Sequence, residues 1–417
     1  MTAMNPMPES ARMLKWILAA GILLWLVWQI VIYGMANHAA QEKQTPEAAV
    51  GWLGSHARGN LDLGLNHVQR APNVALPHLQ AAIAANPADG RSYAALALIY
   101  ETRGALAKAD ALMATAAKMS PQRSDVQLQA GAYWTWRGDY ARALGHLDTV
   151  LRHRPDLYAT LFPELLKILE SPANQPAFVA LLQKPVPWWP AFFIHAARLA
   201  DTVETARRLY SLQSKTPLPV EALSAYLERL QKDDHWVDAW FVWANSLTKD
   251  EITQSGHVYN GSFERPITNL GFDWISRRDA AVIMETAATY GTTGERALHL
   301  LFRGLRVHFQ HLHQNLLLPP GRYFLQGRVR PERLEAPQGM QWVVYCQGRS
   351  EPLAATETFR GSDQWTRFRT EFVVSEGCPV QKLQLELAGR IQMDYDVSGG
   401  IWFDDLAIEQ HKRAGLE

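Results

Sequence analysis

An uncharged apolar run near the N-terminus restricts this chain more than any other feature of its sequence. Residues 16–35 include no charged side chain. About 20 apolar residues in a helix are enough to cross the roughly 30 Å hydrocarbon core of a membrane. A buried core helix is the weaker interpretation, because this run is apolar on every side. The sequence therefore predicts a transmembrane anchor over residues 16–35.

The charges that flank the run predict its orientation. Arg12 and Lys15 precede it, whereas Glu42 and Lys43 cancel each other on the far side. The positive-inside bias then places residues 1–15 in the cytoplasm and the bulk of the chain in the periplasm or another extracytoplasmic space. A cleaved signal peptide stays open as an alternative. Gly34-Met35-Ala36 offers a small-x-small site for cleavage, although signal peptides normally have a shorter apolar segment of 7–15 residues.

Composition limits the function classes. Lys+Arg and Asp+Glu are equal at 41 each, whereas a nucleic-acid-binding protein usually has a basic surplus, so no nucleic-acid partner is expected. The 417 residues predict two or three domains. We expect no enzyme, because the chain has no Ser/His/Asp or Cys/His signature. Asp404 and Asp405 are adjacent in a predicted strand and point to opposite faces, so they cannot form the carboxylate pair of a glycosidase.

A helical repeat follows the anchor. Pro87, Pro121 and Pro155 recur every 34 residues, and Gly104 and Gly138 occupy equivalent positions at predicted turns. This pattern resembles the tetratricopeptide repeat (TPR) family over residues 56–155, with clear repeats at 88–121 and 122–155. The resemblance implies an all-α solenoid, placed at residues 45–250, and a groove that binds a protein partner. One departure is a glutamine at position 127, where a large apolar residue is usual.

Beyond residue 250 the sequence alternates apolar and polar residues between Gly, Asn and Pro turns, which indicates a β-sandwich. The predicted fold class is therefore multidomain: a transmembrane helix, an all-α TPR-like solenoid and a C-terminal all-β jelly-roll sandwich over residues 256–412. The predicted strands are 297–303, 322–330, 341–346, 366–374, 382–388 and 400–408.

Short motifs at both ends of this region carry a second resemblance. It opens on Tyr-Asn-Gly-Ser-Phe-Glu at 259–264 and closes on Gly-Gly-Ile-Trp-Phe-Asp-Asp-Leu at 399–406. In order and spacing these motifs are similar to the galactose-binding-like jelly rolls of carbohydrate-binding modules. The resemblance implies contact with a glycan and commonly a structural calcium ion. On the matching positions, Glu264 and Asp405 would help to hold that ion, with backbone carbonyls completing its six to eight oxygen ligands. Hydrogen bonding at strand ends is the alternative for both residues.

Glycan contact needs exposed aromatic faces on one side of a sheet. The glycan-binding candidates are Trp274, Trp342, Tyr395 and Trp402, and packing in the core is the alternative for each. In the closing strand, residues 401 and 403 are predicted to face inward, so that Trp402 faces outward. Four histidines, His299, His308, His311 and His313, fit no zinc-binding spacing, and no metal is expected there.

The two cysteines, Cys346 and Cys378, lie in the β region. In an oxidising compartment we expect them to form a disulfide. Two buried reduced thiols are the alternative.

Together these features predict a membrane-anchored, non-catalytic binding or assembly factor. The helical region would bind a protein and the sandwich a polysaccharide. Such a combination resembles accessory proteins of bacterial exopolysaccharide production or export. A pure protein-interaction scaffold, whose sandwich does not bind sugar, is the alternative.

Overall fold

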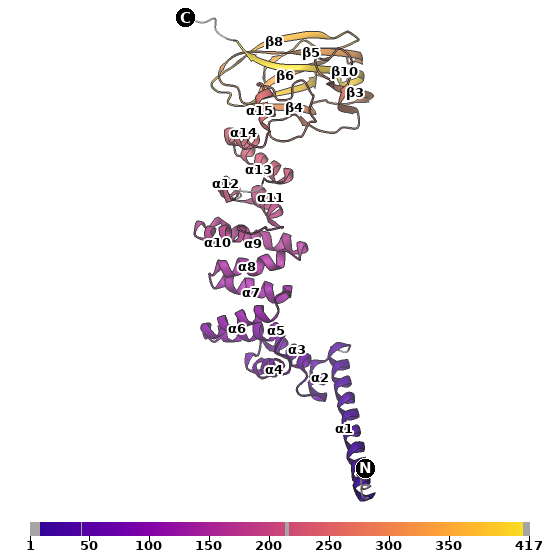
Figure 1. Cartoon of the computed structure of the whole chain (residues 1–417). Coiled ribbons are helices and arrows are strands. Elements are labelled where there is room, and N and C mark those ends of the chain that lie inside the picture. Colours follow the sequence, from indigo (N-terminus) through magenta and orange to yellow (C-terminus); the bar gives the residue numbers. More distant parts are fainter. Residues whose placement is uncertain (1–8, 43, 213–216, 412–417) are drawn as a thin grey trace, which may run out of the picture. The chain divides into compact units, whose positions relative to one another are not determined.

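The computed structural model describes residues 9–42, 44–212 and 217–411, with helices in the N-terminal part and strands in the C-terminal part (Figure 1). The chain divides into two units, Met1–Phe192 with Ser211–Ser214, and Phe193–Tyr210 with Lys215–Glu417. The predicted fold class is confirmed: an apolar N-terminal helix and paired helices precede a β-sandwich of jelly-roll type.

The helices of the described chain vary from 6 to 33 residues in length. They are α1 (Glu9–Gln41), α2 (Pro46–Trp52), α3 (Ala57–His67), α4 (Pro72–Ala85), α5 (Gly90–Thr102), α6 (Leu106–Met119), α7 (Ser124–Trp136), α8 (Tyr140–Leu151), α9 (Tyr158–Glu170), α10 (Gln175–Leu182), α11 (Trp189–Leu199), α12 (Val203–Leu212), α13 (Val220–Lys232), α14 (Trp236–Ala244) and α15 (Lys249–Gln254).

Helix α1 carries exposed apolar side chains along most of its length and buried alanines near its end. In the described part of the chain, Met13–Gln41 is the one helical segment long and apolar enough to cross a membrane, a property that signal sequences share. Ala39 and Ala40 are buried against Ala49 of α2, and Ala36 is buried as well. The last turns of α1 therefore belong to the folded helical region, and the exposed apolar segment ends before them.

The 34-residue spacing reappears in the geometry of the helix pairs. Gly104 ends the α5 turn with φ 75°, and Gly138 ends the α7 turn with φ 73°. Residues other than glycine rarely adopt this backbone conformation. Between α7 and α8 the helices approach closely, because a Cβ at Gly131 would lie 2.8 Å from Leu147. Each predicted small residue thus stands where the chain turns or where two helices meet.

Equivalent cations lie over equivalent rings in the two clear repeats. The ammonium of Lys108 is 3.9 Å from the centre of the Tyr100 ring, and the guanidinium of Arg142 is 3.7 Å from that of Trp134. Gln127 is buried, and its amide donates to two backbone carbonyls at 3.1 and 3.2 Å, which explains how a polar residue is tolerated there. The regular pairing agrees with a helical repeat, whereas membership of the TPR family stays a prediction.

The strands of the described chain form two five-stranded antiparallel sheets. They are β1 (Ile275–Ser276), β2 (Val282–Ala288), β3 (Arg296–Arg306), β4 (Leu312–Leu316), β5 (Gly321–Glu335), β6 (Met340–Cys346), β7 (Pro352–Ala355), β8 (Thr366–Val374), β9 (Gln381–Leu387) and β10 (Asp396–Gln410). The first sheet has the order β1-β4-β9-β6-β7, and the second has the order β2-β3-β10-β5-β8. The sequence predicted six of these strands and missed β1, β2, β4 and β7.

The core of the sandwich lies between the two sheets. Trp342 of β6 in the first sheet meets Phe403 of β10 in the second, with ring centres 5.3 Å apart. Ile401 and Phe403 both belong to this core, as predicted, so the residues between and beside them point outward. The alternation therefore fixes which side chains of each strand can meet a ligand.

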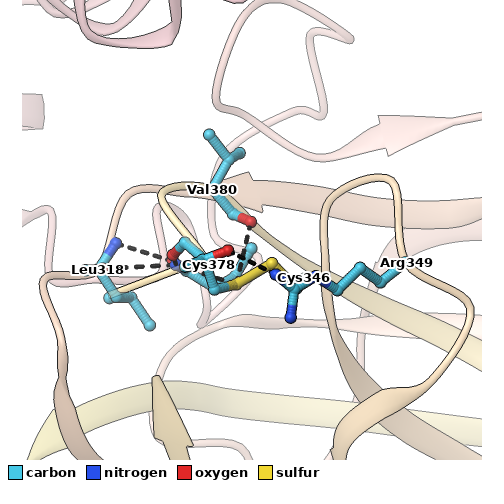
Figure 2. The surroundings of a disulfide bond; sticks show 7 residues. Leu318, Cys346, Arg349, Cys378 and Val380 are labelled. Carbon is cyan, nitrogen blue, oxygen red and sulfur yellow. Dashed lines mark hydrogen bonds between the residues drawn. A yellow bond between two sulfur atoms is a disulfide. The ribbon is translucent and has the colours of Figure 1, made fainter. Parts of the chain in front are cut away.

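A disulfide joins the end of β6 to the loop that precedes β9 (Figure 2). Cys346 and Cys378 are both buried, with their Cα atoms 5.5 Å apart. The Gln381 side chain ties the same loop down: its amide donates to the carbonyl oxygen of Cys378 at 2.6 Å, and its Oε1 accepts from the backbone of Leu318 at 2.8 Å. The bond therefore lies within a hydrogen-bonded end of the first sheet.

We expect the double variant C346A/C378A to unfold at lower urea concentration than the oxidised protein. A crosslink between residues 32 apart in sequence removes about 3–4 kcal/mol of chain entropy from the unfolded state. Urea unfolding of the full chain in detergent, with and without reductant, measures the difference. Equal midpoints for the variant and the oxidised protein would contradict this expectation.

Candidate functional site

Two of the predicted glycan-binding residues lie in the core. Trp274 and Trp342 have no exposed surface, and their ring centres are 5.4 Å apart. A side chain that fills the space between two sheets cannot stack on a sugar. The structure therefore corrects both assignments: these rings hold the sandwich together and face no ligand.

The other two aromatic candidates are held by their neighbours. Tyr395 packs against the core, and its hydroxyl donates to the carbonyl oxygen of Gly389 at 2.9 Å. Trp402 does face outward, but it is only 8% exposed. His299 stacks on its ring at 3.9 Å and 12°, and Arg330 from the next strand lies 5.1 Å from its centre. Trp402 therefore has no open face for a sugar ring.

Glu264 and Asp405, the predicted calcium ligands, line one cavity of 510 Å³. Glu264 Oε1 already accepts from the backbone N–H groups of Glu295 and Arg296, and Asp405 lies 3.6 Å from the Arg328 guanidinium. Within residues 9–42, 44–212 and 217–411, no three His, Cys, Asp or Glu side chains gather in a metal-binding group. Two carboxylates fit calcium only if backbone oxygens supply the other ligands. The ion stays a prediction, and no step below depends on it.

The outer face of the first sheet carries polar side chains that the sequence analysis did not single out. They project from β6 and β9, whose alternate residues Trp342, Leu383 and Leu385 lie in the core. Strand pairing places β6 directly beside β9, so these side chains form one surface. We call it the polar face. It consists of Gln341, Tyr345, Lys382, Gln384 and Glu386, with the buried Val343 between Gln341 and Tyr345 on the same side of β6.

Glu386 is the centre of the polar face. The Tyr345 hydroxyl lies 3.1 Å from both of its carboxylate oxygens, and the Gln384 amide donates to one of them at 2.9 Å. The Gln341 amide reaches the other oxygen at 3.4 Å. Although this is an outer face, Gln384 is only 5% exposed and Glu386 only 8%. The carboxylate is thus held in one orientation by three neutral donors.

Partial burial sets the protonation states around this carboxylate. Burial, followed by the charge of Glu386, raises the pKa of Tyr345 to about 12, so the phenol stays a donor at neutral pH. Burial also lowers the pKa of Lys382, whose ammonium lies 5.4 Å from the Tyr345 ring centre. His313 of β4 pairs with Gln384 across the strands, and burial first, then the charges of Lys382 and Arg277, lowers its pKa to about 4. The imidazole is therefore neutral at physiological pH.

This arrangement is suited to binding hydroxyl groups. A fixed carboxylate, two amides, an ammonium and a neutral imidazole offer both donors and acceptors on one side of the sheet. Among the outward-facing residues of β4, β6 and β9, Glu386 is the one carboxylate.

The sequence predicted the strands of the polar face without revealing the site. The alternation over residues 382–388 predicts a strand with outward polar residues, but any solvent-facing strand shows the same alternation. What identifies the site is that Gln341 lies directly opposite Glu386, and Tyr345 opposite Lys382, on neighbouring strands. Recognising these pairs requires the strand register. That register is a long-range property that a single sequence does not supply.

No protein-family profile matches the chain, and no curated protein matches it. Solved structures similar to its C-terminal β region are carbohydrate-binding modules. One is a family 4 module, 14% identical, covering 37% of this chain and 99% of its own, with a TM-score of 0.28. Another is a family 22 xylan-binding domain from Paenibacillus barcinonensis, at 16% identity, 37% and 94% coverage and a TM-score of 0.26. A family 61 module bound to β-1,4-galactotriose has 18% identity, 38% and 100% coverage and a TM-score of 0.27. At these values the ligands of those modules do not transfer to this chain.

Trp402→Ala should lower stability. The variant loses a large buried side chain and the ring on which His299 stacks, which costs about 3–5 kcal/mol in typical cores. Thermal unfolding of the full chain measures the loss, and Trp136→Ala, at a 64% exposed tryptophan, is the matched control. An unchanged melting temperature would show that Trp402 is not packed as described.

Stability should fall as the pH drops from about 6.5 to about 4, in part because of His313. The folded state keeps this imidazole neutral down to a pKa of about 4, whereas the unfolded chain binds a proton near the usual value of 6.5. The stability that the neutral His313 imidazole contributes is fully present above pH 6.5 and is lost below pH 4. Each unit of difference between the folded and unfolded pKa corresponds to about 1.4 kcal/mol of the free energy of unfolding.

His313→Gln should therefore lose less stability than the natural protein between pH 7.5 and pH 4.5. Urea midpoints at the two pH values give the comparison, with His308→Gln as the control at an exposed histidine of the same sandwich. An identical loss in the His313 variant and the natural protein would contradict the assigned burial.

Proposed function

We propose that the sandwich binds a polysaccharide on the polar face. One observation carries this proposal: the half-buried side chains of Gln341, Tyr345 and Lys382 reach the surface of an outer sheet face around Glu386. Tyr345 and Gln384 orient the Glu386 carboxylate. Burying polar groups is costly unless they are hydrogen-bonded, and here the bonds come from side chains that can also bond to a ligand. Protein interfaces usually centre on several apolar and aromatic residues, whereas this face carries one buried valine, Val343, among polar side chains. Sugar hydroxyl groups therefore match the polar face better than the apolar centre of a protein interface does.

In this proposal the chain is a non-catalytic binding factor held in a membrane by α1. The exposed apolar segment within Met13–Gln41 and the basic residues before it support an anchor with a cytoplasmic N-terminus. The disulfide between Cys346 and Cys378 supports an oxidising compartment for the sandwich, since such bonds are rare in the cytosol. The bulk of the chain would then lie in the periplasm.

The helical region would bind a protein partner. Helices α7, α8 and α9 line a hollow of 680 Å³ whose wall includes Leu128, Trp136, Leu161 and Ile168. Trp136 is 64% exposed, which is unusual for an indole without a ligand or partner. A protein at this hollow and a polysaccharide at the sandwich would make the chain an assembly factor of exopolysaccharide production or export.

Glu386→Gln should weaken binding to the preferred polysaccharide by roughly 10- to 100-fold, because a hydrogen bond to a charged group is worth about 1.5–3 kcal/mol. The ligand is first identified on a glycan array with the full chain in detergent. Isothermal titration of both proteins with that glycan then gives the ratio of dissociation constants. The substitution is isosteric, so the fold should be kept.

The matched control is Glu376→Gln, the same change at an exposed residue of the loop between β8 and β9. It should leave binding unchanged. If Glu386→Gln binds the glycan as the natural protein does, the polar face is not the site. If the natural protein binds nothing on a broad array, the scaffold alternative is favoured.

A further inference from the structure

The outer face of the second sheet is rich in arginine along β5 and β8. Phe368 and Phe372 of β8 and Val329 of β5 lie in the core, so the alternate residues of these strands point away from it. Arg328 and Arg367 are directly opposite each other across the two strands. Like charges in that position destabilise a sheet. We call the following residues the arginine face: Arg322, Arg328, Arg330, Arg367 and Arg369.

Three of these arginines are neutralised or buried, and two are not. Arg322 pairs with Glu371 at 3.5 Å, and Arg328 lies within 4 Å of Asp404 and Asp405. Arg330 is 4% exposed and donates to the Thr289 hydroxyl. Within the described chain, neither Arg367 nor Arg369 has a carboxylate partner, and both are exposed. The guanidinium of Arg369 lies 3.9 Å from the centre of the Phe324 ring, so one of its faces is covered. The arginine face therefore leaves two exposed guanidinium groups without a carboxylate partner on an edge strand.

Two aromatic rings stand beside Arg328 and Arg330 of the same face. The Tyr290 ring lies over Arg330, with the guanidinium 4.2 Å from its centre, yet the residue is 67% exposed. The indole N–H of Trp365 donates to the Tyr290 carbonyl oxygen at 2.8 Å, and Arg328 lies 5.1 Å from the centre of its ring. Tyr290 thus rests on a buried cation on one side and meets solvent on the other.

The loop that carries Tyr290 is fastened to the sheet before any ligand arrives. Arg328 donates to the Gly291 carbonyl oxygen, and the backbone N–H of Thr293 donates to Asp404 at 3.2 Å. Gly291 has φ 73°, and a Cβ at that position would lie 2.8 Å from Trp365. The two rings are therefore preorganised, which lowers the entropic cost of binding.

We propose that Arg367 and Arg369 of the arginine face, with Tyr290 and Trp365, bind an acidic polysaccharide whose sugar rings carry carboxylates. A guanidinium takes a carboxylate with two parallel hydrogen bonds, and same-face residues of one strand are about 6–7 Å apart, so Arg367 and Arg369 can hold neighbouring groups. The exposed ring of Tyr290 offers a flat apolar surface to the C–H face of a sugar. Edge strands often carry charges that prevent aggregation, but that role needs no fixed aromatic rings beside them. This surface belongs to the second sheet and does not depend on the polar face.

The test uses the full chain in detergent and a hexamer of galacturonate, titrated by calorimetry. The matched ligand is the same hexamer with its carboxylates methyl-esterified. We expect binding of the acid, weaker binding at higher salt, and at least tenfold weaker binding of the ester. The double variant R367A/R369A should lose at least tenfold in affinity for the acid, and Tyr290→Ala should lose severalfold.

Arg322→Ala is the matched control, because it removes an exposed arginine of the same face that Glu371 already neutralises. It should change affinity less than twofold. Melting temperatures of all variants check that the fold is kept, which is expected for exposed side chains. Glu386→Gln should leave binding of the acid unchanged, so failure of the polar face and failure of this proposal are distinguishable.

Three results would overturn the proposal. The first is equal affinity of R367A/R369A and the natural protein for the acid. The second is equal affinity of the natural protein for the acid and its ester. The third is binding to vesicles of anionic phosphatidylglycerol that depends on Arg367 and Arg369 but not on Tyr290, which would identify a lipid-binding surface.

Discussion

The contact of Trp342 with Phe403 between the two sheets is the constraint on which both outer faces depend. It places the inward residues of β6 against those of β10. Side chains alternate along a strand, so a slip of one residue would exchange the inner and outer sets. With that register Gln384 and Glu386 face outward beside Tyr345. If the register slipped by one residue, the Glu386 carboxylate would enter the apolar core, and burying a charge there costs a large amount of free energy.

Much of the fold could be predicted from the sequence, because local pattern and long-range packing agree. The strand predicted at 366–374 coincides with β8. Strand β4 was missed because Gln314 interrupts its apolar pattern. That side chain is 1% exposed and bonds to both the N–H and the carbonyl oxygen of Tyr259, at 3.0 and 2.9 Å. The residue it stabilises lies 55 positions away, which a local pattern cannot show.

The candidate site was harder to predict, since aromatic residues serve cores and binding sites equally well. Alternation correctly turned Trp402 outward, but its burial comes from His299 and Arg330 on two other strands. Tyr290 carries an exposed ring for a related reason: a distant arginine supports its inner face. In both cases the neighbour, and therefore the exposure, is set by strand order. A single sequence gives the alternation but not the order.

The two outer faces of the sandwich differ in chemistry. The polar face surrounds one carboxylate with neutral donors, whereas the arginine face has two exposed guanidinium groups without a carboxylate partner. A chain with both could hold two kinds of polymer segment, or two parts of one polymer. The central claim concerns the polar face.

A crystal structure of the chain with its preferred oligosaccharide tests that claim most directly. The account predicts sugar hydroxyl groups within hydrogen-bonding distance of Glu386 and Gln384, with Tyr345 kept in place. An oligosaccharide bound elsewhere, for example at the cavity lined by Gly304 and Ser398, with the polar face open to solvent, would contradict it.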